Sequence, residues 1–113
     1  MTTLSTHVLD TMHGLPASEV KLRLEDKAGT VLYTGVTNPD GRCPGLSEAV
    51  PDLASGQYAL VFAVADYFSG MGVTLPEPPF LDEVRIAFGL ASPGHYHVPL
   101  LVSPFAYSTY RGS

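Results

Sequence analysis

The feature that most constrains the fold is a series of short runs in which apolar and polar residues alternate. Val20–Glu25 alternates cleanly, and Gln57–Val64 and Val84–Leu90 repeat the period of two. Successive side chains of a strand point to opposite faces, so each run is predicted to be a strand with one face turned inward. Glycines and prolines lie between the runs, where they are typical of turns. The sequence therefore favours a β-rich fold.

Other segments complete a predicted set of about seven or eight strands. Further strands are predicted at Leu4–Asp10, Val31–Thr37 and His95–Leu101, and a strand-like run follows the turn at Ser103-Pro104. The runs on either side of Ala28–Thr30 are predicted to pair as a hairpin. Many short strands separated by turns are typical of an antiparallel β-sandwich.

One short helix is predicted among these strands. Asp66 can accept hydrogen bonds from exposed amides and so cap a helix at Tyr67–Met71, and Gly72 tolerates the left-handed exit. Cys43–Ser55 has no regular pattern and is predicted to be a loop with at most a short edge strand. The whole chain, residues 1–113, has the length of a single domain with its own core.

The composition argues against several classes of function. A net charge of −5, with six dispersed basic side chains, disfavours binding to nucleic acid, which needs a basic surface. The single cysteine, Cys43, cannot form an intrachain disulfide, and the sequence has neither a signal-peptide pattern nor an apolar run of about 20 residues. We therefore expect a soluble, cytoplasmic protein. A charged fraction of only 15% also indicates that a partner subunit covers part of the surface.

Histidine and arginine residues are the candidates for chemistry. His95 and His97 would project from the same side of a strand. His7 lies on another predicted strand, and Arg42 directly follows the turn Asn38–Gly41. A histidine near a strand is often structural, and an arginine after a turn is often only solvated. Three histidines on strand-like segments, in a chain with four, nevertheless favour a functional site.

Two kinds of site remain open from the residues alone. A His-x-His pair with a third histidine could supply three nitrogens to zinc and leave a position for water. A metal-free hydrolytic site would use one histidine as general base, the other as proton shuttle, and an arginine to stabilise negative charge. Arg42 and Arg111 would repel a divalent ion, which favours the metal-free site. A Ser-His-Asp triad is disfavoured because the sequence has no Gly-x-Ser-x-Gly motif.

Several stretches of the chain are similar to a known family. They are Leu4–Asp10, Thr37–Arg42, Asp66-Tyr67-Phe68, His95–Leu101 and the terminal Tyr110-Arg111-Gly112-Ser113. Together they resemble the 5-hydroxyisourate hydrolases, the transthyretin-related enzymes of urate breakdown, over nearly the whole chain. The segment Ser103–Thr109 is also similar to transthyretin itself.

The resemblance implies a fold, an assembly and a reaction. The fold would be an all-β, transthyretin-like antiparallel sandwich of two four-stranded sheets with one short helix. The assembly would be a homotetramer whose central channel holds the sites between subunits. The reaction would be hydrolysis of 5-hydroxyisourate at a ring amide, giving 2-oxo-4-hydroxy-4-carboxy-5-ureidoimidazoline, without a metal or organic cofactor.

The resemblance also assigns catalytic roles to residues of this chain. His7 and His97 match the two catalytic histidines, and either would act as the base that takes a proton from water. Arg42 matches an arginine that binds the substrate and polarises it, and His7 would also contact the substrate. Ser113 would help to order the histidines and water through its hydroxyl and carboxylate.

Three further residues are implied at the site, and one alternative function stays open. Tyr110 matches a tyrosine that contacts the substrate, whereas His95 and Arg111 are additional candidates, with Arg111 shaping the pocket. The alternative is a transthyretin-like carrier that kept the channel and lost catalysis. A carrier does not need the histidines, the arginine and the terminal motif together, so their presence favours the hydrolase.

Overall fold

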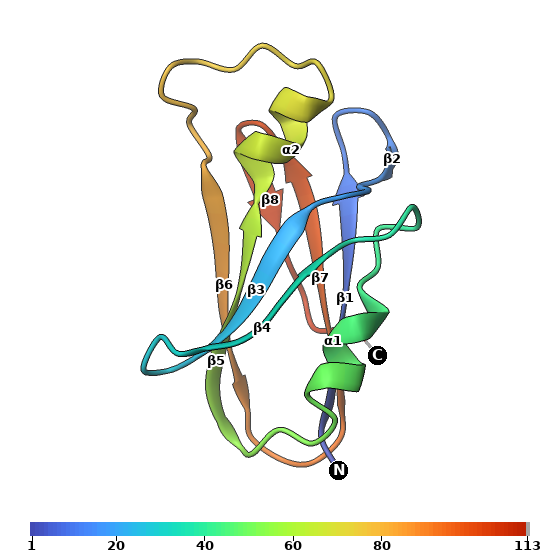
Figure 1. Ribbon diagram of the computed structural model, residues 1–113, viewed down its shortest axis with the longest axis vertical. Helices are drawn as coiled ribbons and strands as arrows, with labels where there is room; N and C mark the ends of the chain where they lie inside the picture. Colours follow the sequence, from blue (N-terminus) through green and yellow to red (C-terminus); the bar gives the residue numbers. More distant parts are fainter. Residues whose placement is uncertain (113) are drawn as a thin grey trace.

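The computed structural model describes residues 1–112, which form two four-stranded sheets stacked as a sandwich (Figure 1). In the first sheet the strand order is β2-β1-β7-β8, formed by Leu15–Pro16, Thr3–Asp10, His95–Ser103 and Ala106–Ser108. In the second sheet the order is β4-β3-β5-β6, formed by Val31–Val36, Lys21–Asp26, Gly56–Ala63 and Glu83–Leu90. The predicted β-sandwich is confirmed, as is the hairpin of β3 and β4.

The core lies between the two sheets and is built from one face of each. In β1 and β7 every second residue is buried, and Val8 pairs directly with Leu100. Leu60 and Phe62 of the second sheet belong to the same core and are inaccessible to solvent. Burial of a large apolar side chain contributes about 1.5–3 kcal/mol, and a slip of one residue would turn these side chains outward. The core therefore fixes which residues of β1 and β7 face away from it.

The central pair of the first sheet corrects the prediction of a wholly antiparallel sandwich. Strands β1 and β7 run parallel, in a register that pairs Thr3 with His95 and Asp10 with Val102. Alternation of apolar and polar residues is the same in parallel and antiparallel strands, so the sequence pattern alone could not separate them. A parallel pair needs a long connection, and here most of the chain lies between the two strands.

Residues 1–112 contain two short helices, not the single helix predicted. Helix α1, Pro44–Ala49, lies in the segment predicted to be a loop; its proline occupies the first turn and Leu46 is buried. Helix α2, Val64–Gly70, follows β5 directly, so Asp66 lies inside its first turn and does not cap it. A carboxylate still interacts favourably with the amide dipoles there. Neither helix, nor any other within residues 1–112, is long and apolar enough to span a membrane.

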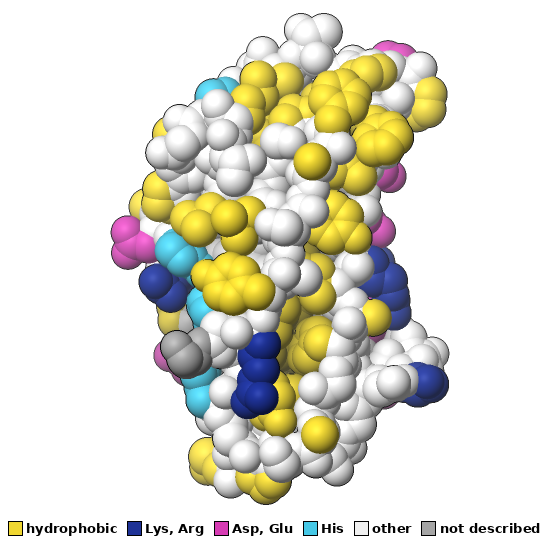
Figure 2. Space-filling model, turned by 180° about the vertical axis from the view of Figure 1, so that it is seen from behind, with side chains coloured by type: hydrophobic (Ala, Val, Ile, Leu, Met, Phe, Trp, Pro, Cys, Tyr) yellow, Lys and Arg dark blue, Asp and Glu magenta, His cyan; other side chains and the backbone are white. Residues whose placement is uncertain are grey.

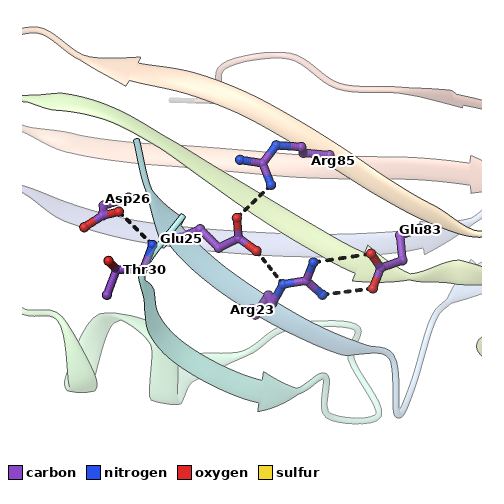
Figure 3. A network of polar contacts seen from close by, with 6 residues as sticks. All are labelled: Arg23, Glu25, Asp26, Thr30, Glu83 and Arg85. Carbon is purple, nitrogen blue, oxygen red and sulfur yellow. Dashed lines mark hydrogen bonds and ion pairs between the residues drawn. The ribbon is translucent and has the colours of Figure 1, made fainter. Parts of the chain in front are cut away.

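A network of charged side chains links β3 to β6 across β5 (Figure 3). Arg23 donates from Nε to Glu25 at 2.6 Å and from Nη1 to Glu83 at 2.9 Å. Arg85 donates from Nη1 to the other oxygen of Glu25 at 2.8 Å. The hydrogen bonds from Arg23 and Arg85 lower the pKa of Glu25 despite its partial burial. The two positive and two negative charges of the network balance one another.

Candidate active site

Strands β1 and β7 carry a polar face that points away from the core. Thr3, Ser5 and His7 alternate with buried residues along β1, and His95 and His97 do so along β7. The parallel register places Thr3 opposite His95 and Ser5 opposite His97. Figure 2 shows histidine side chains gathered along one edge of the molecule, beside a Lys or Arg side chain. Two segments separated by most of the chain thus form one surface.

Hydroxyl groups connect the two histidines of β7. Oγ of Ser5 lies 2.8 Å from Nδ1 of His97 and 3.0 Å from Nε2 of His95. Oγ1 of Thr3 lies 2.7 Å from Nδ1 of His95. The sequence prediction did not include the two hydroxyl residues. Their positions on the face of His7 were readable from the period of two, but their contacts depend on the register between β1 and β7.

The turn after β4 brings Arg42 to His7. Oδ1 of Asn38 accepts hydrogen bonds from the backbone amides of Asp40 and Arg42, each at 3.0 Å. Arg42 and His7 then form a β-bridge, and the carbonyl oxygen of Asp40 lies 2.8 Å from Nε2 of His7. A carbonyl only accepts, so this nitrogen of His7 carries the proton. In neutral His7, the lone pair is therefore on Nδ1.

His97 has the electrostatic environment of a base that stays neutral. Burial, followed by the positive charges of Arg42, His7 and His95, lowers its pKa below the usual 6.5. Its Nδ1 faces Ser5, whereas Nε2 makes no hydrogen bond to any residue from 1 to 112. His97 can therefore accept a proton at Nε2 near neutral pH.

The C-terminal tail packs directly against His97. The amide of Gly112 donates to the carbonyl oxygen of His97 at 2.8 Å, and a Cβ at this glycine would lie 2.5 Å from Cδ2 of the imidazole. Upstream, Oγ1 of Thr109 donates to the carbonyl of Pro99 at 2.6 Å. Only a glycine allows the tail to approach the ring this closely. The predicted site residue Ser113 lies outside the described residues.

Tyr110 and Arg111 border a different part of the surface. They line a hollow of about 370 Å³ together with Phe88, Tyr96 and other residues of β6 and β7. The guanidinium carbon of Arg111 lies 4.1 Å from the centre of the Tyr96 ring, a cation–π distance. None of the described residues lining this hollow is a histidine. The structure thus brings together His7, Arg42, His95 and His97, and places Tyr110 and Arg111 at a neighbouring hollow.

No group of three His, Cys, Asp or Glu side chains within residues 1–112 is arranged to hold a metal ion. The three histidines of the polar face are instead divided between two sets of partners. His95 and His97 share Ser5, whereas His7 is bound to the carbonyl of Asp40. The chemistry that these residues offer on their own is proton transfer beside a fixed positive charge.

Gly41 holds the Arg42 turn against β1, and its replacement should be costly. Its φ is +76°, and an added Cβ would lie 2.4 Å from the carbonyl oxygen of Val8. We expect Gly41→Ala to lower the free energy of unfolding by about 2–4 kcal/mol, measured by urea denaturation. Gly29→Ala is the matched control, because its φ is +87° but nothing lies within 4 Å of the added Cβ. Equal losses for both variants would show that the contact with Val8 contributes nothing.

Comparison with known proteins shows which family the chain belongs to. Residues 4–112 match the HIUase/Transthyretin family. A Mesorhizobium japonicum protein named 5-hydroxyisourate hydrolase is 54% identical, over 97% of this chain and 91% of its own. The structure of Klebsiella pneumoniae 5-hydroxyisourate hydrolase superposes with a TM-score of 0.85 at 36% identity, covering 100% of both chains. Sea bream transthyretin, solved in complex with thyroxine, gives a TM-score of 0.84 at 30% identity, over 97% of this chain and 94% of that one. The chain therefore belongs to the HIUase/Transthyretin family.

Proposed function

We propose that the protein hydrolyses 5-hydroxyisourate at a ring amide and releases 2-oxo-4-hydroxy-4-carboxy-5-ureidoimidazoline, as a cytoplasmic enzyme. The observation that carries the proposal is the convergence of His7, Arg42 and His97 on one polar face. The names of the relatives at about half identity support the choice of substrate. This convergence provides a base and a cation, which attack on an amide requires.

In the proposed reaction His97 is the general base. Nε2 of His97 takes a proton from water as the oxygen attacks the carbonyl carbon of the substrate. Arg42 stabilises the negative charge that develops on the carbonyl oxygen. His7, held by its Nε2–H donation to the carbonyl of Asp40, contacts the substrate with its other edge. The lowered pKa of His97 supports this assignment, because it keeps that imidazole neutral.

The C-terminal motif supplies the remaining proposed contacts. Tyr110 binds the substrate and Arg111 shapes the pocket, while Ser113 orders the histidines and the attacking water through its hydroxyl and carboxylate. The contact of Gly112 with the imidazole of His97 supports a role for the tail at this site. A C-terminal fusion should therefore lower the activity more than an N-terminal one.

We also propose that four copies assemble, with the sites between subunits. Large apolar side chains lie exposed, among them Phe80 and Phe105, whose ring centroids are 5.9 Å apart. A small protein rarely leaves such pairs in water unless a partner covers them. Sedimentation velocity at micromolar concentration should give the mass of four chains. A monomeric mass would contradict the assembly.

The activity has a direct test. 5-Hydroxyisourate is generated from urate with urate oxidase, and its ultraviolet absorbance is followed with and without the protein. We expect the protein to accelerate the decay, and EDTA to leave this acceleration unchanged. Loss of activity with EDTA would favour a metal site. No acceleration, combined with binding of an apolar ligand such as thyroxine, would favour the carrier.

The pH dependence of kcat/KM should follow the protonation of His97. Because its pKa is lowered from 6.5, the neutral base persists at pH values where an ordinary histidine is largely protonated. The expected profile is flat at neutral pH and falls on acidification with a midpoint below 6.5. Initial rates from about pH 5 to about pH 8 at constant ionic strength would measure this midpoint. A midpoint above 6.5 would contradict His97 as the base.

A further inference from the structure

Ser5 occupies a position between two imidazoles that the roles described so far do not explain. Its Oγ lies 2.8 Å from Nδ1 of His97 and 3.0 Å from Nε2 of His95, and Nδ1 of His95 lies 2.7 Å from Oγ1 of Thr3. The four side chains form one continuous chain of hydrogen bonds. It begins at the half-buried His97, passes through the exposed His95 and ends at Thr3, which is half-buried.

The chemistry of a hydroxyl group restricts how protons can be placed along this row of hydrogen bonds. Ser5 has one hydrogen and two lone pairs, so it can donate to only one imidazole, and when it does it accepts from the other. In the first arrangement, His97 donates from Nδ1 to Ser5, Ser5 donates to Nε2 of His95, and His95 donates from Nδ1 to Thr3. In the second arrangement all three bonds are reversed. Both histidines are protonated on Nδ1 in the first arrangement and on Nε2 in the second.

We propose that Ser5 is a positioning residue that couples the tautomers of His95 and His97, by donating to one ring while accepting from the other, and relays the proton of the attacking water from His97 toward solvent. The proposal rests on the hydrolase function proposed above. In the first arrangement Nε2 of His97 has its lone pair available, as a general base requires. In the second arrangement Nε2 carries a proton that can be donated to the leaving ring nitrogen.

The relay moves one proton through each group. Nε2 of His97 takes a proton from water, while its Nδ1 proton passes to Ser5. The hydroxyl proton of Ser5 passes to Nε2 of His95, the Nδ1 proton of His95 passes to Thr3, and the hydroxyl proton of Thr3 passes to solvent. Each side chain gains one proton and loses one, so all remain neutral. Donation from Nε2 of His97 to the leaving nitrogen reverses every transfer and takes a proton back from solvent.

The surroundings of His97 favour a relay over a lasting imidazolium. Burial opposes a charge on His97, and the positive charge of Arg42 opposes it further. A route that passes the proton onward keeps a second cation from forming beside Arg42. The exposed position of His95 gives the relay contact with water at its far end.

The tautomers can be measured without substrate. Long-range 15N–1H correlation spectra of the assembled protein, recorded above the histidine pKa values, identify the protonated nitrogen of each ring. We expect His95 and His97 to share one tautomer in the wild type, and to lose this relation in Ser5→Ala. Opposite tautomers in the wild type would overturn the inference, whatever the protein hydrolyses.

Steady-state kinetics test the relay role of Ser5 in the working enzyme. We expect Ser5→Ala to lower kcat about tenfold with little change in KM, and Ser5→Thr, which restores a hydroxyl, to recover most of the loss. Ser69→Ala, an exposed serine of α2, should leave kcat unchanged. Full kcat in Ser5→Ala would overturn the relay while leaving the hydrolase function intact. An inactive wild type would instead refute the hydrolase function, and the tautomer spectra would still decide the coupling of the two rings.

Discussion

Replacement of Arg42 by glutamine is expected to lower kcat by about 10²–10³-fold, because a single donor to a developing oxyanion contributes that much in hydrolytic sites. The fold of the turn should survive, since Asn38 is bonded to the backbone amide of Arg42 and not to its side chain. The same substitution removes one of the charges that lower the pKa of His97. The pKa should therefore rise, yet remain below 6.5, because burial is the larger cause.

One further variant separates the charge of Arg42 from its geometry, and a second, at another position, is a control. Arg42→Lys keeps the positive charge, so the pKa of His97 should stay lowered, but it loses the planar fork and so most of the rate. Arg85→Gln removes the same charge from the network on the second sheet, where it contacts Glu25, and should change neither quantity. Steady-state kinetics and an NMR titration of His97 measure both effects. Activity of Arg42→Gln within a factor of about three of wild type would exclude Arg42 from the reaction.

The histidines and the arginine of the candidate site were identified from the sequence, but their contacts and the two hydroxyl residues between them were not. Period two placed His95 and His97 on one side of a strand, His7 and Arg42 were candidates from residue type and position, and the family resemblance assigned their roles. The contact of Ser5 with both β7 histidines depends on the parallel register of β1 and β7. Such a register is set by packing between distant segments, which local patterns do not report.

The predictions for the two helical segments were wrong for local reasons. Helix α1 spans only Pro44–Ala49 and buries one residue, Leu46, so it is too short for a helical period to emerge. The start of α2 was misplaced because the apolar run of β5 continues into the helix without a polar residue. The N-cap is Ala63, whereas Asp66 had been predicted to cap the helix. By contrast, β3 and β6 alternate throughout, and both were located within one residue of their observed bounds.

Loss of the buried Asp10 carboxylate should cost much of the stability of the fold. It is 1% exposed at the end of β1, and its carboxylate accepts three hydrogen bonds. The donors are the hydroxyl of Tyr67 at 2.7 Å, the amide of His13 at 3.0 Å and Nδ1 of His13 at 2.6 Å. Burial alone would raise the pKa of Asp10, but together these bonds hold it below the usual 3.8. Through these hydrogen bonds the carboxylate links β1 to the turn that follows it and to helix α2.

Asp10→Ala should lower the free energy of unfolding by about 3–5 kcal/mol, because it leaves the buried Tyr67 hydroxyl and the His13 donors without an acceptor. Tyr67→Phe removes one donor and should cost about 1–2 kcal/mol. In the double variant the Tyr67 hydroxyl is no longer left unpaired. Its loss of stability should therefore be smaller than the sum of the losses in the two single variants. Urea denaturation of the four proteins gives this coupling. Strict additivity would show that the two side chains do not stabilise one another.

The pH dependence of stability gives an independent measure of the same carboxylate. The pKa of Asp10 is lower in the folded state than its usual 3.8, so the unfolded chain binds a proton there more readily. Its contribution is fully present above that value and is lost as the pH falls through the folded pKa. Wild type should therefore lose more stability on acidification below about pH 4 than Asp10→Ala does. Parallel curves for the two proteins would mean that the Asp10 carboxylate titrates alike in the folded and unfolded states. The hydrogen bonds from His13 and Tyr67 would then stabilise the charged and the neutral form of Asp10 equally.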